Sequence, residues 1–338
     1  MTPSLGVEGG SILESGDWLA TVSFRYYNSR QDVLGDEPQD QPIVYANTHL
    51  FQFDINVVYG VTKRLSLVLD IPFQYGTRAT SIEHDFTRPN PPPLHTMRAG
   101  GLGDMRLRGD FWLLNPVKHP NQNIALGLGV KFPTGDYGAT DTAFRPTGPV
   151  ERPVDPAIQL GDGGWGIVLH GHGFARLSSS KGWLKNTVAY AEGTYVANPE
   201  EMNSTENTLG DLPVPFPPTS DPRLKYDSIP DQFLFRLGFT QVGFPIKELS
   251  FSFGGRFEGV PSHDLIGGDE GWRLPGHAVS VEPGISYSRG KDYIAVTVPI
   301  AVWRHASKSV PFEQVGVPGP GLETLADYQI TVTYTRTF

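Results

Sequence analysis

Hydrophobic and polar residues alternate along the last segment of the chain, residues 328–338. Successive side chains of a β-strand point to opposite faces. One face of this segment would therefore carry Tyr328, Ile330, Val332, Tyr334 and Phe338, and the other would carry Gln329 and four threonines. The first face suits lipid and the second suits water. The pattern favours a strand of a membrane barrel, although a soluble edge strand would alternate in the same way.

The same period of two recurs in about twelve segments bounded by Gly, Pro, Asn and Asp. Each segment is roughly long enough to cross a bilayer as a tilted barrel strand, which takes about 9–11 residues. The expected strands are 18–27, 50–59, 65–75, 103–113, 124–132, 165–177, 184–196, 233–242, 249–258, 278–288, 293–303 and 328–338.

The connections between these strands alternate in length. The long ones are 29–47, 80–99, 135–155, 197–228, 261–274 and 305–324, and the short ones are 61–64, 115–120, 178–182, 243–245 and 289–291. Outer-membrane barrels have long loops at one end and short turns at the other, whereas a soluble sandwich has no reason to sort its loops in this way. We therefore predict an all-β chain that forms a 12-stranded antiparallel transmembrane β-barrel of the outer-membrane type, with both termini on the periplasmic side. An N-terminal periplasmic or plug segment, 1–16, would precede the barrel at 17–338.

The size of the barrel decides which face points inward. Twelve strands enclose a lumen too wide to be filled as an apolar core, because about eight strands already reach that limit. The polar face should then line a wet interior and the apolar face should meet lipid. Tryptophans near the strand ends fit the interfacial aromatic belts of membrane proteins. They are Trp18 and Trp183 on the periplasmic side, and Trp165 and Trp303 on the outer side.

Composition excludes several classes of protein. No run of about 18 apolar residues exists, which excludes a transmembrane helix, and the mean hydropathy of −0.25 is neutral because half of each barrel strand faces water. The absence of cysteine excludes disulfides, thiolate metal sites and cysteine nucleophiles. A net charge of −9 argues against a nucleic-acid partner. The first ten residues lack the basic and apolar regions of a signal peptide. We therefore infer a bacterial outer-membrane protein whose signal has been removed, with membrane lipid as one partner.

Charged residues of both signs occupy positions that should face the lumen. A transverse electric field across a constriction would orient and filter polar solutes, whereas a paired network would rigidify the wall and close the pore. Both interpretations stay open because pairing requires the strand register. The candidate pore-lining residues are Arg25, Asp54, Asp70, Asp104, Arg106, Arg108, Asp110, Lys131, His170, His172, Arg236, Arg256 and Glu282.

Signals for metal, cofactor or catalytic chemistry are weak. His170 and His172 are spaced so that both could reach one metal, but zinc needs a third and usually a fourth ligand and none is adjacent in sequence. Residues 161–166 match a dinucleotide fingerprint by letter only, because that motif must follow a strand and open a helix. Some 12-stranded barrels are lipid hydrolases, yet no Ser–His pair with an orienting group is recognisable. We expect no cofactor, no metal and no enzyme activity.

Two features of the long connections suggest partners or a constriction. Proline-rich tracts at 89–93 and 212–218 form either a rigid loop folded into the mouth or simply loops that cannot pair as strands. The long connections are also acidic on balance, which serves solubility or concentrates divalent cations at the outer rim.

Four segments carry a family resemblance: 65–76, 100–110, 125–136 and 155–176. The chain resembles the transporter family labelled "MetA-pathway of phenol degradation", a group of outer-membrane channels, over about half its length. Its terminal phenylalanine also resembles the end of Gram-negative outer-membrane barrels. The resemblance implies a barrel fold and an association with aromatic compounds, but no functional residues.

The sequence thus predicts an outer-membrane channel for passive diffusion of small molecules, with hydrophobic or aromatic solutes implied by the family resemblance. The alternative is a plugged barrel that has a structural role or binds an envelope protein. A lumen sealed by residues 1–16 or by the proline-rich loops would favour that alternative.

Overall fold

The computed structural model describes residues 12–40, 46–81, 94–145, 148–177, 186–207, 222–316 and 319–338. Their strands alternate between buried polar positions and exposed apolar ones. In β1 (Trp18–Ser29), for example, Thr21, Ser23 and Arg25 are buried while Val22 is exposed. Aromatic and β-branched side chains, which favour strands, therefore cover the outside of the sheet.

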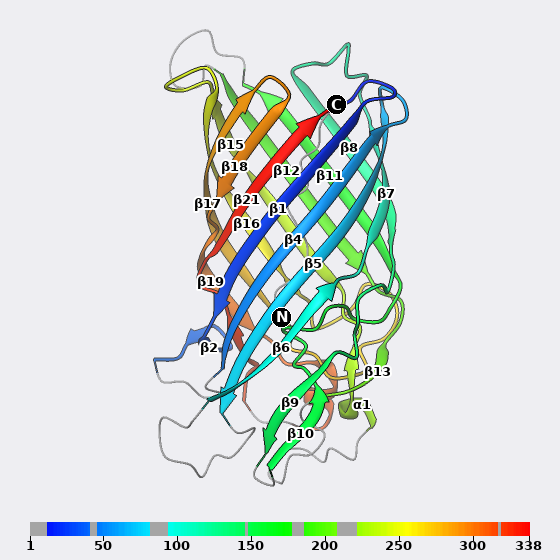
Figure 1. The fold of residues 1–338 in the computed structure, drawn as a ribbon, viewed down its shortest axis with the longest axis vertical. Helices are drawn as coiled ribbons and strands as arrows, with labels where there is room; N and C mark the ends of the chain where they lie inside the picture. Colours follow the sequence, from blue (N-terminus) through cyan, green and yellow to red (C-terminus); the bar gives the residue numbers. More distant parts are fainter. Residues whose placement is uncertain are drawn as a thin grey trace.

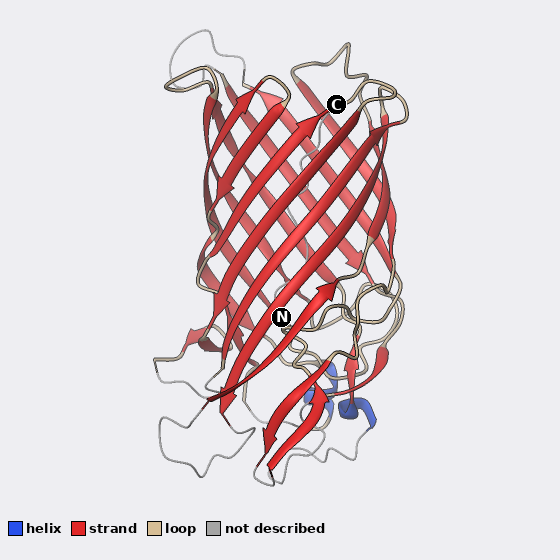
Figure 2. Ribbon diagram, viewed as in Figure 1, coloured by secondary structure: helices blue, strands red, loops and turns tan. Residues whose placement is uncertain are grey.

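The described strands form a closed antiparallel barrel of twelve staves, in which each stave pairs with its neighbours in sequence and the last pairs with the first (Figures 1 and 2). This confirms the predicted fold class. After β1, the staves are β4 (Asn47–Gly60), β5 (Leu65–Ser81), β6 (Leu94–Leu102) with β7 (Arg106–Trp112), β8 (Gln122–Lys131), β11 (Gly166–Arg176), β12 (Thr187–Ala197), β15 (Gln232–Val242), β16 (Leu249–Val260), β17 (Gly276–Arg289), β18 (Asp292–Thr297) with β19 (Ile300–Ala306), and β21 (Gln329–Thr337).

Two staves are interrupted. The predicted strand at 103–113 begins only at Arg106 and is preceded by β6, most of which was predicted to be loop, and the predicted strand at 293–303 is broken. Residues 103–105 separate β6 from β7, and there the backbone N–H of Gly103 donates to the Pro72 carbonyl at 2.7 Å. Val298 and Pro299 separate β18 from β19. Proline has no backbone N–H and cannot donate to a sheet ladder, which accounts for the second break.

The two ends of the barrel differ, as the loop lengths predicted. The short connections, such as residues 61–64 and 290–291, lie at the end that also holds the C terminus (Figure 1). Phe338 donates a backbone hydrogen bond to Trp18 there, so the start of the first stave and the end of the last one meet. We call this the short-connection end and the opposite end the long-loop end.

The long-loop end carries the additional elements. They are a three-stranded sheet of β2 (Gln31–Leu34), β3 (Glu37–Pro38) and β20 (Leu322–Leu325), a hairpin of β9 (Thr140–Arg145) and β10 (Gly148–Pro153), the pair β13 (Met202–Glu206) and β14 (Tyr226–Ser228), and the short helices α1 (Pro222–Lys225) and α2 (Val310–Gln314). Neither helix in the described ranges is long and apolar enough to cross a membrane.

Part of the expected N-terminal segment lies within the described residues. Leu13 is buried at the short-connection end against the inward-facing side chains of Leu19, Val58 and Val68. Gly16 donates a backbone hydrogen bond to Gly60 at 2.8 Å. Residues 1–11 and Trp183 lie outside the described residues, so a plug formed by residues 1–16 stays a prediction. The exposed Trp18, Trp165 and Trp303 lie on the outside of the barrel.

Candidate functional site

The interior of the barrel contains the charged residues that the sequence selected. Most are buried although they belong to a polar wall, which shows that their side chains pack against one another. Arg25, Asp54, Asp70, Arg106, Arg108, Asp110, Lys131, His170, Arg256 and Glu282 are buried, while Asp104, His172 and Arg236 are partly exposed. Their role as pore-lining residues stays a prediction.

One group of ion pairs lies on β5 and β7. The Arg106 Nε donates to Asp70 Oδ2 at 2.9 Å, and the Arg108 Nε donates to Asp110 Oδ1 at the same distance. Asp70 and Arg106 are directly opposite each other on adjacent strands. The register of β5 and β7 therefore creates the first pair, while the second joins alternate residues of one strand.

A second group lies across β12, β15, β16 and β17. Arg256 contacts Glu258 at 2.7 Å and Glu282 at 3.5 Å, and Arg236 contacts Glu192 at 2.8 Å and Glu282 at 3.3 Å. Glu282 thus forms ion pairs with two arginines on different strands, and it accepts a hydrogen bond from Arg236. We call the two groups together the charged belt, which consists of Asp70, Arg106, Arg108, Asp110, Glu192, Arg236, Arg256, Glu258 and Glu282.

Asp54 lies beside the belt without a direct ion pair. Both of its carboxylate oxygens are buried and have no hydrogen-bond partner in the described part of the chain. The nearby charges that act on it are those of Asp70, Arg25 and Arg106. Arg25 itself donates to Gln52 on the adjacent strand. Asp54 is therefore an acceptor facing the interior whose hydrogen-bonding capacity is unused.

A segment between β10 and β11 folds into the mouth at the long-loop end. We call residues 154–162 the inward segment. Val154, Ile158 and Leu160 are buried in an apolar cluster with Tyr27 and Leu50 of the barrel wall. Gly76 allows this packing, because a Cβ there would lie 2.7 Å from Ile158.

Polar contacts also hold the inward segment to the wall. Arg78 on β5 contacts Asp155 at 3.2 Å, and the Gln74 side chain donates to the Gln159 carbonyl at 2.6 Å. At the far end of the segment, the Asp162 carboxylate pairs with Lys131, and its backbone N–H donates to Asp104 at 3.1 Å. The inward segment is therefore fixed to three staves, β5, β8 and the β6–β7 stave.

Sequence reasoning missed the inward segment. The only loops in which it considered a constriction contain the proline-rich tracts at 89–93 and 212–218, which lie outside the described residues. A signal was present, since Val154, Ile158 and Leu160 are bulky apolar residues within a long connection. The missed polar residues are Glu192, Arg78, Asp155 and Asp162. Glu192 was detectable as a charge in the middle of an expected strand.

A cavity of about 70 Å³ lies between the inward segment and the charged belt. Its polar lining includes Asp104, Arg106, Lys131 and Asp227, and its apolar lining includes Tyr27, Leu50, Pro72, Leu160 and Val196. A cavity needs only about 10–15 Å³ to hold one water molecule, so this one has room for a larger guest. We call it the lumen cavity.

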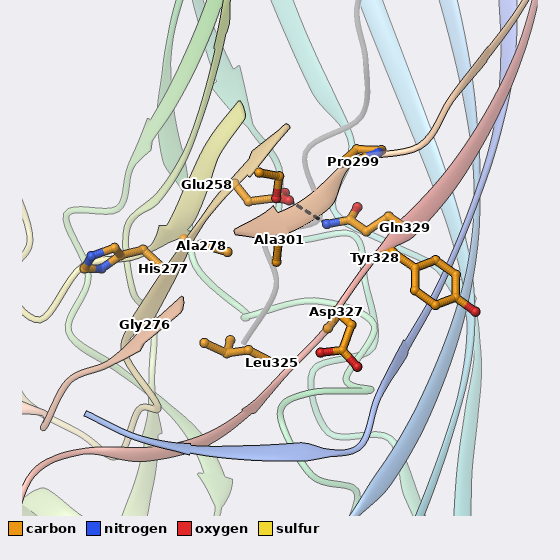
Figure 3. Close-up of a pocket in the computed structure, with 13 residues that line it drawn as sticks. Glu258, Gly276, His277, Ala278, Pro299, Ala301, Leu325, Asp327, Tyr328 and Gln329 are labelled. Atoms are coloured by element: carbon orange, nitrogen blue, oxygen red, sulfur yellow. Dashed lines mark hydrogen bonds between the residues drawn. The ribbon is translucent and has the colours of Figure 1, made fainter. Parts of the chain in front are cut away.

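A smaller niche lies at the break between β18 and β19. It has a volume of about 20 Å³, close to the space for one water, and is lined by small residues such as Ala278 and Ala301. Figure 3 shows Gln329 donating to Glu258 across it, at 2.5 Å, with Tyr328 directed away from this bond. The niche is too small for a solute.

The two histidines singled out in the sequence contact each other on β11. His170 Nε2 lies 3.1 Å from His172 Nδ1, and His170 Nδ1 lies 2.9 Å from the hydroxyl of Thr194 on β12. Asp110 brings a carboxylate close to both rings. The glycine-rich residues 161–164 lie in the connection that precedes β11.

Solved structures provide the comparison for this geometry. The chain is similar to an outer-membrane channel from Pseudomonas putida F1, with 13% sequence identity, a TM-score of 0.59, and coverage of 98% of this chain and 100% of that one. The chain has the fold of an outer-membrane β-barrel. It also aligns with the toluene transporter TbuX of Ralstonia pickettii, at 9% identity and a TM-score of 0.42, over 96% of this chain and 90% of that one.

No protein-family model and no curated protein matches the chain. The likeness to solved structures supports the resemblance found in the sequence at the level of the outer-membrane β-barrel fold. Assignment to the phenol-degradation family stays a prediction, because 13% identity shows a shared fold and does not show a shared substrate.

Proposed function

We propose that this protein is a channel of the bacterial outer membrane through which small molecules cross by passive diffusion. The lumen cavity carries this proposal. It lies inside the barrel, between the long-loop mouth and the charged belt, and a solute on its way through the barrel would occupy it. Diffusion needs no energy source and no cofactor.

The lining of the lumen cavity supports small amphipathic or aromatic solutes. Tyr27, Leu50 and Leu160 offer an apolar surface to a ring, while Arg106 and Lys131 offer polar contacts. Sites that combine an apolar wall with a few polar groups bind small organic molecules and fix their orientation. The proposed route runs from the long-loop end through the lumen cavity and past the charged belt to the short-connection end.

A plugged structural barrel is the second candidate, and the burial of the charged belt favours it. Arg256, Glu258 and Glu282 are each at most 3% exposed, so little water reaches that part of the interior. Such a network would rigidify the wall and leave the protein to bind an envelope partner. Divalent cations at the long loops would be compatible with either function.

Solute uptake into liposomes separates the two candidates. The purified barrel should accelerate the swelling of liposomes in small solutes, and the rate should fall as solute size increases. Solutes with an aromatic ring should enter faster than aliphatic solutes of equal size and charge. Swelling no faster than in protein-free liposomes, for every solute down to the smallest, would support the plugged barrel.

A further inference from the structure

Three potential metal ligands meet inside the barrel although they come from two strands that are not neighbours. Asp110 belongs to β7, and His170 and His172 belong to β11, with β8 between them. One ligand atom from each residue lies within 4.8 Å of the other two. The sequence supplied the two histidines but could not reveal that a carboxylate lies beside them.

A glycine on the intervening strand makes this meeting possible. Gly127 lies in register with Asp110 on one side and with His170 on the other. A Cβ at Gly127 would lie 2.1 Å from Asp110 Oδ1 and 3.1 Å from the His170 Cβ. Because Gly127 has no side chain to fill that space, β7 and β11 can bring their polar groups together across β8.

The spacing of the two rings suits a metal ion. Bonds of about 2.0–2.1 Å at tetrahedral angles place ligand nitrogens about 3.4 Å apart. His170 Nε2 and His172 Nδ1 are 3.1 Å apart and face each other. A small displacement of either ring would make room for an ion between them. The second nitrogen of His172 is buried and has no hydrogen-bond partner in the described residues. Moving the ring would therefore break no hydrogen bond at that atom.

The surrounding charges leave Asp110 able to contribute. The Arg108 Nε lies 2.9 and 3.1 Å from the two carboxylate oxygens of Asp110. A carboxylate offers about four lone-pair sites, so Arg108 does not exhaust it. Around His172 the negative charges of Asp110 and Glu192 oppose the positive charge of Arg108. Around His170 the arginines Arg106, Arg108 and Arg236 oppose a cation, which limits affinity but leaves the ligand set complete.

We propose that Asp110, His170 and His172 bind one divalent transition-metal ion, of the zinc, nickel or copper class, inside the barrel. Imidazole nitrogen suits these ions, and two imidazoles with one carboxylate form a recognised three-ligand set that leaves a position open to water or a solute. His172 is the most exposed of the three ligands, so the ion would enter the site from its side.

Zinc binding to the full-length barrel, purified in detergent without a histidine tag, tests this proposal. Titration against a zinc-sensitive dye should show about one tight site per chain at neutral pH. His172→Ala should weaken binding at least about tenfold. Gly127→Ala should weaken it too, although all three ligands remain, because the new Cβ occupies the space of the Asp110 carboxylate.

Two histidine variants away from the cluster serve as controls. His119→Ala changes an exposed residue at the short-connection end, and His305→Ala removes a ring that pairs with Asp36 at the long-loop end. Neither should change the affinity. Absence of a tight site in the wild type, unchanged binding in His172→Ala, or loss of binding in His305→Ala alone would overturn the proposal.

Folding is checked by the shift in gel mobility that heating causes in intact barrels. If His172→Ala does not fold, His172→Gln provides the same comparison with a polar side chain of similar size. The titration measures binding without any flux through the barrel. Failure of the metal site is therefore distinguishable from failure of the proposed channel function.

Discussion

Arg256 is the residue whose removal should disturb the interior most. Its side chain is 2% exposed and contacts two glutamates, Glu258 and Glu282. Burying charges costs several kcal/mol per ion, and this cost is offset only while each charge has its partner. Register decides these contacts, since Arg236 and Arg256 lie opposite each other on β15 and β16 and share Glu282.

We expect Arg256→Met to lower the free energy of unfolding by about 3–5 kcal/mol, because it leaves the buried Glu258 without its arginine partner and Glu282 with Arg236 alone. Urea-induced unfolding in lipid vesicles measures this. Arg336→Met is the matched control, because Arg336 pairs with Asp292 on the exposed surface, where ion pairs contribute little. Equal losses in the two variants would show that burial does not set the energy of these pairs.

Asp227 at the long-loop end should make stability depend on pH. Burial, reinforced by the negative charge of Asp155, raises the pKa of Asp227 well above its ordinary value. As the pH rises above about 3.9, Asp227 loses its proton in the unfolded chain before it does so in the folded protein. The free energy of unfolding therefore falls until the pH passes the raised pKa. Asp227→Asn should therefore gain stability relative to the wild type as the pH rises above about 4.

Asp269 should have the opposite effect on how stability depends on pH. Partial burial raises the pKa of Asp269, but hydrogen bonds from the Asp264 backbone and from His263 outweigh it and lower the pKa. Asp269 therefore contributes to the free energy of unfolding at neutral pH, and this contribution is lost as the pH falls through the lowered pKa. Asp269→Asn should thus lose stability relative to the wild type as the pH rises from acid to neutral. Differences that do not change with pH in either variant would contradict these assignments.

At the scale of elements, the inward segment should govern passage through the long-loop mouth. Ile158 is fully buried and lies against Gly76 on the wall. Ile158→Ala removes apolar contacts worth about 2–5 kcal/mol at a buried site. We expect the segment to loosen and become more accessible to protease, and small solutes to enter liposomes faster. Val150→Ala, in the exposed hairpin next to the segment, should change neither.

The strands were predictable because their chemistry repeats with a simple period. Neighbouring residues such as Val332 and Thr333 alternate in polarity along a strand. The alternation of long and short connections then predicted which connections lie at the same end of the barrel. The inward segment was not predictable, because Ile158 packs on strands distant in sequence and follows no period. The pairing of Arg106 with Asp70, and the approach of Asp110 to His170 across Gly127, depend on register, which the sequence does not reveal.

At the scale of the whole molecule, both ends of the described chain lie at the short-connection end, and we predict that this end faces the periplasm. A cysteine in place of Leu265, which is exposed at the long-loop end, should react with an impermeant reagent on intact cells. A cysteine in place of Lys63, in the connection between β4 and β5, should react only after the outer membrane is permeabilised. If only the Lys63→Cys variant reacted on intact cells, the short-connection end would face outward, opposite to this prediction.

The proposed channel requires a continuous path through the interior despite its buried charges. Single-channel recording in a planar bilayer tests it most directly. We predict discrete current steps from the wild type, and larger steps from Ile158→Ala, because the inward segment narrows the mouth. Absence of steps from folded, inserted wild-type protein and from Ile158→Ala would contradict the proposed channel function and indicate a sealed barrel.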